Sequence, residues 1–87
     1  MVIQTDAANS NPRYPNAIVV TVSTKGKEVP FHIPVDPSER NGLEAKSFVK
    51  CEQVMTISKE RLVHRLGSLD EEHLIAVAIA IRRVLEV

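Results

Sequence analysis

The sequence predicts a fold that is mainly β, with one α-helix at its C-terminal end. Segments 17–24 and 47–57 are rich in β-branched residues and alternate in polarity as strands do. From about residue 70 onward, apolar residues recur at helical spacing behind an acidic first turn. No repeat, linker or low-complexity segment divides the 87 residues, so we expect a single domain over residues 1–87.

The first predicted strand covers residues 17–24, which read AIVVTVST. Its apolar face is expected to carry Ile18, Val20 and Val22. A second strand, residues 31–35, contains Pro34, which lacks a backbone donor and therefore favours a sheet edge. Asn41-Gly42 suits the positive φ angles of a tight turn, so the second strand is expected to pair antiparallel with the third.

The third strand raises a question about a single amide. Alternation over residues 47–57 places one set of residues on a common apolar face: Val49, Cys51, Met55 and Ile57. Gln53 falls in the middle of that face, so the pattern predicts a buried amide. Cys51 is the single cysteine and is expected to be an inert packed thiol in a reducing compartment.

The last element is a helix from about Asp70 to Leu85. Ser58 can cap a short helical turn before it, and the long helix is capped either by Ser68, in a capping box with Glu71, or by Asp70. One apolar face is expected to hold Leu74, Val77, Ala78, Ile81 and Leu85. Two further apolar residues lie outside it, Ile75 and Ile79. This helix is too apolar for one small sheet to cover, so we expect self-association or a partner protein.

Composition narrows the function classes. Eleven Lys and Arg balance eleven Asp and Glu, which argues against a protein that binds nucleic acid or membranes through overall charge. A polyanion site would have to be a local patch. The N-terminus does not resemble a signal peptide, and the longest apolar run, residues 74–81, is much shorter than the roughly 20 residues that span a bilayer. We therefore expect a cytoplasmic protein that does not enter the membrane.

Several motifs occur in the order found in one toxin family. They are a D-x-x-N loop (Asp6, Asn9), a β-branched strand that ends in a hydroxyl residue, the pair Glu52-Gln53, and a T-I-x-K-x-R-L run over residues 56–62. In this order the chain resembles the PemK/MazF family of mRNA interferase toxins. The resemblance implies an SH3-like small β-barrel of the CcdB-like type with a C-terminal helix. It also implies a homodimeric toxin of a type II toxin–antitoxin system that cuts single-stranded RNA without metal or other cofactor and is inhibited by a cognate antitoxin.

The family pattern also begins with segments that this sequence does not contain. Family members start with a first strand, a loop with a G-x-R-P motif whose arginine is catalytic, and a second strand that leads into VIQ at residues 2–4. We therefore expect the 87-residue form, which lacks this N-terminal hairpin, not to cleave RNA appreciably. The alternatives are a toxin recorded without its beginning, an inactive remnant that dimerises or binds antitoxin, and an SH3-like interaction module unrelated to RNA.

The resemblance assigns candidate site residues. Ser23 aligns with the family's second catalytic position, a threonine, and keeps the hydroxyl. RNA contacts are expected from residues near it and from the Glu-Gln strand: Thr24, Lys25, Lys27 and Gln53. The alternative for Ser23 and the two lysines is a solvated turn, and for Gln53 it is a bond to neighbouring backbone inside the barrel. His32, His64 and His73 are expected to be surface histidines rather than general bases.

Overall fold

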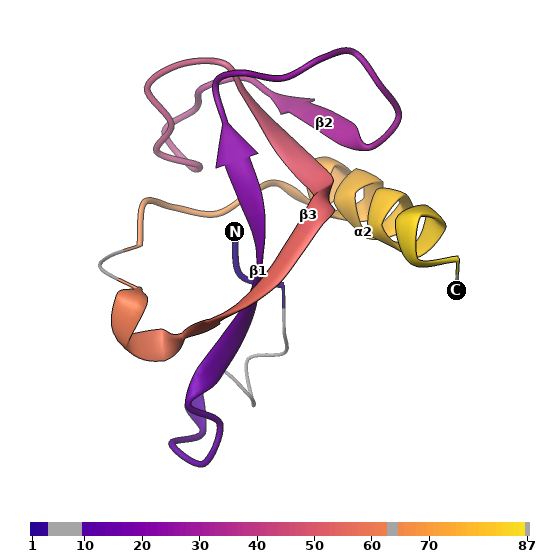
Figure 1. Cartoon of the computed structure of the whole chain (residues 1–87). Helices are drawn as coiled ribbons and strands as arrows, with labels where there is room; N and C mark the ends of the chain where they lie inside the picture. Colours follow the sequence, from indigo (N-terminus) through magenta and orange to yellow (C-terminus); the bar gives the residue numbers. More distant parts are fainter. Residues whose placement is uncertain (4–9, 63–64, 87) are drawn as a thin grey trace.

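The computed structural model describes residues 1–3, 10–62 and 65–86, and in this part of the chain three antiparallel strands pack against a C-terminal helix (Figure 1). The strands are ordered β1-β3-β2 in the sheet. In chain order the elements are β1 (Asn16–Ser23), β2 (His32–Val35), β3 (Ser47–Ser58), the 3₁₀ turn η1 (Lys59–Arg61) and α2 (Glu71–Leu85). The predicted fold class is therefore confirmed. None of the helices in the described residues is both long enough and apolar enough to cross a membrane.

Local turn and edge-strand signals in the sequence are confirmed. Pro34 lies on β2, which is an edge strand. Gly42 has a φ of 67°, and its N–H donates to the Ser38 carbonyl over 3.0 Å. The Asn41 side-chain oxygen accepts from the N–H groups of Ser38 and Leu43, which fixes this turn.

The pairing of β1 with β3 contains a β-bulge. Thr21 lies opposite Lys50, but the preceding residue, Val20, lies opposite Val54. Cys51, Glu52 and Gln53 therefore have no partner on β1. Side chains alternate between the two faces of a strand, and the three unpaired residues are an odd number. The bulge therefore reverses which residues of β3 face the core on its two sides.

This reversal corrects the predicted face of β3. Val49 and Cys51 are 1% and 0% exposed, as expected, but the next inward residue is Val54. Met55 is 48% exposed, so its predicted place on the buried face is wrong. Gln53 is exposed as well, so the predicted buried amide is wrong for the same reason.

A small apolar core joins the sheet to α2. It consists of Val20, Val35, Val49, Cys51, Val77 and Ala80. The Cys51 thiol lies 4.0 Å from the Val77 carbonyl oxygen, so it is enclosed between β3 and the helix. Burial, followed by the neighbouring Glu52 carboxylate, raises the pKa of the Cys51 thiol. The prediction of an inert packed cysteine is consistent with this setting.

The helix spans the predicted residues, but it is rotated from the predicted orientation. Val77 and Ala80 are the residues of α2 that are fully buried. Leu74, Ala78 and Leu85 are exposed, so the predicted apolar face is wrong in these three residues. The reason is that β2 and β3 cover only a narrow strip of the helix surface. The small Ala80 side chain in this strip lets the helix approach the two strands closely.

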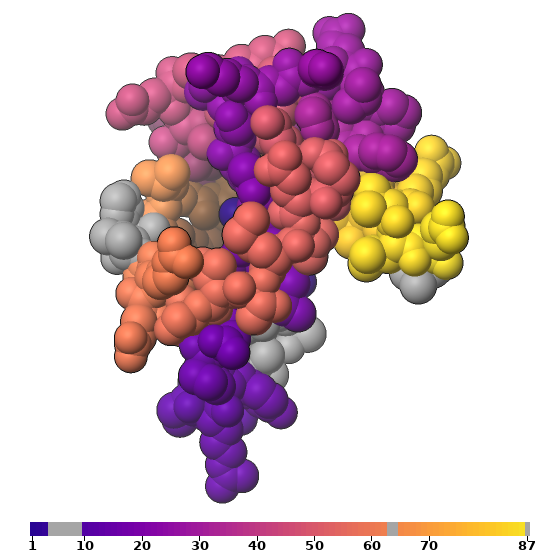
Figure 2. Space-filling view, in the orientation of Figure 1, coloured from indigo at the N-terminus to yellow at the C-terminus, as the bar shows by residue number. Residues whose placement is uncertain are grey.

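A large hollow lies beside β1, and the described sheet is open on this side. Its volume is about 1140 Å³, and Figure 2 shows it between β1 and the orange segment that follows β3. Apolar side chains dominate its lining, among them Val22, Leu62, Leu66 and Leu74. The segment Met1–Ile3 forms part of the wall and bonds to β1, where the Val20 N–H donates to the Met1 carbonyl over 2.8 Å.

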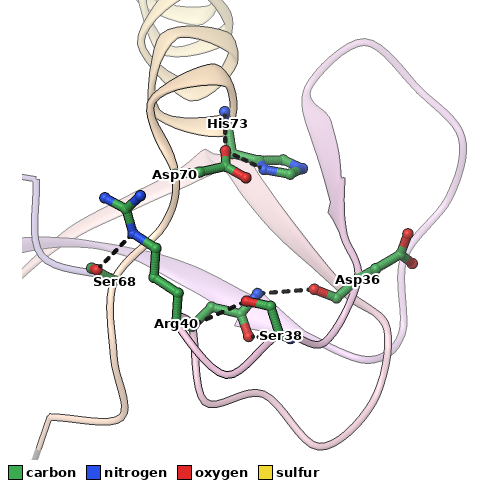
Figure 3. Close-up of polar contacts among 7 residues, drawn as sticks. Asp36, Ser38, Arg40, Ser68, Asp70 and His73 are labelled. Atoms are coloured by element: carbon green, nitrogen blue, oxygen red, sulfur yellow. Dashed lines mark hydrogen bonds and ion pairs between the residues drawn. The ribbon is translucent and has the colours of Figure 1, made fainter.

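Two chain segments are fastened together at the N-terminal end of α2 (Figure 3). The Ser68 N–H donates to the Arg40 carbonyl over 2.8 Å, and Arg40 Nε donates to Ser68 Oγ over 3.3 Å. Gly67 lies so close to the Arg40 carbonyl that a β-carbon has no room.

The cap of α2 is Asp70 rather than Ser68. The Asp70 side chain accepts the His73 N–H over 2.9 Å, and this bond holds the pKa of the Asp70 carboxyl below its usual range.

We predict that Gly67→Ala destabilises the protein by about 1–3 kcal/mol, because the added methyl group forces the Arg40 backbone away. Urea unfolding measures this as a lower midpoint at unchanged slope. The control is Glu44→Ala at an exposed position, which is expected to change the free energy of unfolding by less than about 0.5 kcal/mol. Equal midpoints for both variants would show that the two segments are not in close contact.

Candidate functional site

One face of the sheet is polar and faces away from α2. Ser23 lies opposite Phe48, and Lys50 lies opposite both Thr21 and His32. These residues alternate with the buried Val49 and Cys51, so they project from the opposite face of the sheet. We call this surface the outer face; it comprises Thr21, Ser23, His32, Pro34, Phe48, Lys50 and Glu52.

Ser23 is half-buried at the end of β1, where the outer face meets the hollow. Its Oγ accepts a hydrogen bond from the Lys25 N–H over 3.1 Å. A hydroxyl that accepts in this way keeps its own hydrogen for donation to another group. Thr24, the next residue, is exposed and also borders the hollow.

The loop after β1 is laid over the outer face and carries two lysines. Gly26 rests against the Phe48 ring so closely that a β-carbon has no room there. The Lys27 N–H donates to His32 Nδ1 over 3.1 Å, which fixes the far side of the loop. The side chains of Lys25 and Lys27 are exposed, and no carboxylate of the described residues pairs with them. The structure therefore brings two available cations close to Ser23.

His32 has a carboxylate partner that the sequence did not reveal. Its Nε2 lies 2.9 Å from Glu52 Oε1, and the His32 side chain is only 13% exposed. The expectation of a surface histidine is therefore wrong at this position. The two residues are 20 positions apart and meet because β2 pairs with β3, so no local spacing could have indicated the contact.

Gln53 lies in the bulge, next to the outer face but apart from Ser23. It adjoins Val54, the partner of Val20, and Val20 lies three residues of β1 from Ser23, or about 10 Å at a rise of about 3.3 Å per residue. The Gln53 amide is exposed and makes no side-chain hydrogen bond with the described residues. Its donors and acceptor are therefore open to a ligand.

The remaining polar candidates do not join this site. His73 is bound to Asp70 at the start of α2, with Nδ1 2.7 Å from Oδ1, so it is a cap partner rather than a free surface histidine. His64, Asp6 and Asn9 lie outside the described residues. Within residues 1–3, 10–62 and 65–86, no three His, Cys, Asp or Glu side chains are grouped as metal ligands would be.

Comparison with known proteins identifies the family. The model of the PemK-like, MazF-like toxin of type II toxin–antitoxin systems matches residues 1–85. The chain belongs to this toxin family. A curated relative, the endoribonuclease EndoA of Bacillus subtilis (strain 168), is 36% identical over 74 residues, which cover 83% of this chain. The chain spans 61% of the length of that relative.

Solved structures of toxins share the fold. The Mycobacterium tuberculosis toxin MazF-mt6 superposes with a TM-score of 0.86 at 25% identity, covering 100% of this chain and 84% of that one. Another Mtb toxin gives a TM-score of 0.84 at 26% identity, covering 97% and 88% of the two chains. An endoribonuclease solved with its cognate antitoxin from a mycobacterial species gives 0.84 at 18% identity, covering 100% and 79%; this match concerns the fold alone.

Proposed function

We propose that this PemK/MazF-family protein is the toxin of a type II toxin–antitoxin system and acts in the cytoplasm as an endoribonuclease on single-stranded RNA. The observation that carries the proposal is the family match over residues 1–85. The endoribonuclease named among the relatives supports the activity, and the arrangement of Ser23 beside two available lysines is compatible with it.

In this proposal Ser23 acts on the phosphate group. When the 2′-hydroxyl of the RNA attacks the adjacent phosphorus, negative charge increases on the non-bridging oxygens. The Ser23 hydroxyl keeps its hydrogen because its oxygen accepts from the Lys25 N–H, so it can donate to such an oxygen. Thr24, Lys25 and Lys27 would bind the phosphates on either side, where exposed hydroxyl and ammonium groups suit the sugar–phosphate backbone.

Gln53 is proposed to read a base. RNA is recognised in sequence through unstacked bases, whose edges carry both donors and acceptors. A side-chain amide offers both, and the bulge directs this one to solvent rather than into the core. With about 10 Å of β1 between Ser23 and Val20, which lies opposite the neighbour of Gln53, the two residues would contact different nucleotides of one RNA strand.

Partners are proposed on the apolar surface of the helix. Ile75 and Ile79 are 53% and 47% exposed on α2 and lie one turn apart. Apolar residues at such exposure, on successive turns of one helix, favour burial against another protein surface. We propose a second copy of the chain and the cognate antitoxin as the two partners; the neighbour solved with its antitoxin has the same fold.

A second candidate is a toxin-like module that binds RNA or antitoxin without cleavage. One observation favours it, because no side chain of the described residues hydrogen-bonds to Ser23 Oγ as a general base would. The two functions are separated by incubating labelled single-stranded RNA in EDTA with the 87-residue form and with a form extended upstream by a G-x-R-P segment. Binding without cleavage by both forms would support the module, and metal-free cleavage by the extended form would support the endoribonuclease.

For a form of the chain that is extended upstream by a G-x-R-P segment, we predict that Ser23→Ala lowers the cleavage rate by about 100- to 1,000-fold, the usual cost of removing one donor to a developing oxyanion. Single-turnover cleavage of a labelled RNA in EDTA measures this rate. The matched control is Ser23→Thr in the same extended form, which keeps the hydroxyl and should retain activity within about tenfold of the extended parent. Full activity of Ser23→Ala would remove this residue from the mechanism.

For the same extended form we also predict that Gln53→Ala changes which base is preferred near the cut, because one base loses the hydrogen bonds that distinguish it. Cleavage of an RNA pool with randomised positions, followed by sequencing of the products, measures this preference. Thr56→Ala, an exposed change on the same strand, is the control and should leave the preference unchanged. An unaltered preference in Gln53→Ala would contradict base reading by this residue.

A further inference from the structure

Lys50 is a cation at the centre of the outer face that the sequence did not single out. It lies on the central strand β3, opposite Thr21 of β1 and opposite His32 of β2. Its place in β3 is between Phe48, the partner of Ser23, and Gln53 in the bulge. An RNA strand that reached both proposed contact residues would therefore pass over Lys50.

The acidic residue of the outer face, Glu52, is bound to a residue other than Lys50. Glu52 is the next residue on this face of β3, about 7 Å away at a rise of about 3.3 Å per residue, and would be the natural ion-pair partner of Lys50. Instead, Glu52 Oε1 lies 2.9 Å from His32 Nε2. Among the described residues Lys50 has no ion pair, and its half-buried side chain stays available for an external anion.

The His32–Glu52 contact has a defined donor. His32 Nδ1 accepts the Lys27 N–H over 3.1 Å, so in the neutral ring the hydrogen is on Nε2. Nε2–H therefore donates to Glu52 Oε1. One imidazole thus fastens the lysine-bearing loop on one side and holds the Glu52 carboxylate on the other.

We propose that Lys50 binds a phosphate of the single-stranded RNA and that His32 is a positioning residue that keeps Glu52 from pairing with Lys50. The inference rests on the proposed RNA substrate. Lys50 provides a positive charge for the RNA strand where it passes between Ser23 and Gln53. The net charge of the protein is zero and provides no general attraction for RNA. His32 acts through Glu52 and does not need to touch the RNA.

Binding of an RNA that carries 2′-O-methyl groups, and so cannot be cleaved, tests the role of Lys50 across a series of salt concentrations. Each phosphate contact contributes about 0.7 to the slope of log K against log salt for a single strand. Lys50→Gln should weaken binding to all sequences alike and reduce the slope by about 0.7, whereas Lys50→Arg should keep the slope. The matched control is Arg82→Gln on exposed α2, which loses the same charge elsewhere and should change neither quantity.

The outcomes separate this inference from the proposed function. If the unmodified protein binds the RNA and Lys50→Gln binds it with the same slope, the inference is overturned and the RNA substrate stands. If the unmodified protein neither binds nor cleaves RNA, both are overturned. Unfolding midpoints of the variants, measured in urea, exclude loss of folding as the cause of weaker binding.

The role of His32 is tested by a double variant. His32→Ala should release Glu52 to pair with Lys50 and weaken RNA binding. Adding Glu52→Gln removes the competing carboxylate, so the double variant should recover the salt slope and the part of the affinity that Lys50 contributes, while the part that depends on the Lys27 anchor stays lost. A purely structural role for His32 would leave the double variant as weak as His32→Ala, and that result would overturn the positioning role.

Discussion

The β-bulge in β3 determines both the core and the polar surface of this protein. Opposite a single step along β1, from Val20 to Thr21, β3 moves from Val54 to Lys50. The three residues between them are directed to three different environments. Cys51 enters the core beside Val77, Glu52 meets His32, and Gln53 is exposed. A strand without the bulge would place either the core or the outer face out of register, because neighbouring side chains point to opposite faces.

The outer face and the loop laid over it carry unpaired positive charges, although the net charge of the protein is zero. Lys25, Lys27 and Lys50 are all left without a carboxylate partner among the described residues, and Glu52, the acidic residue of the outer face, is bound to His32. Local charge of this kind attracts a polyanion over the short distances that remain after screening by salt. The proposed ligand, a single-stranded RNA, is a polyanion and is compatible with this arrangement.

Features set by local chemistry could be predicted from the sequence, and features set by long-range pairing could not. The turn at Gly42 and the edge position of Pro34 depend on a few adjacent residues, and both were predicted correctly. The exposure of Gln53 depends on how β1 pairs with β3, and the His32–Glu52 contact depends on β2, so neither has a signal in the spacing of residues. The rotation of α2 likewise depends on the shape of the sheet, which the helix sequence does not contain.

The central claim is that RNA binds across the outer face of the sheet, and chemical-shift mapping tests it most directly. An ¹⁵N-labelled sample is titrated with single-stranded RNA that carries 2′-O-methyl groups, and changes in the amide signals are followed residue by residue. We expect the largest changes in the loop after Ser23, at Lys50 and at Gln53, with little change along α2. Changes confined to α2 or to the lining of the hollow, with the outer face unaffected, would contradict the account.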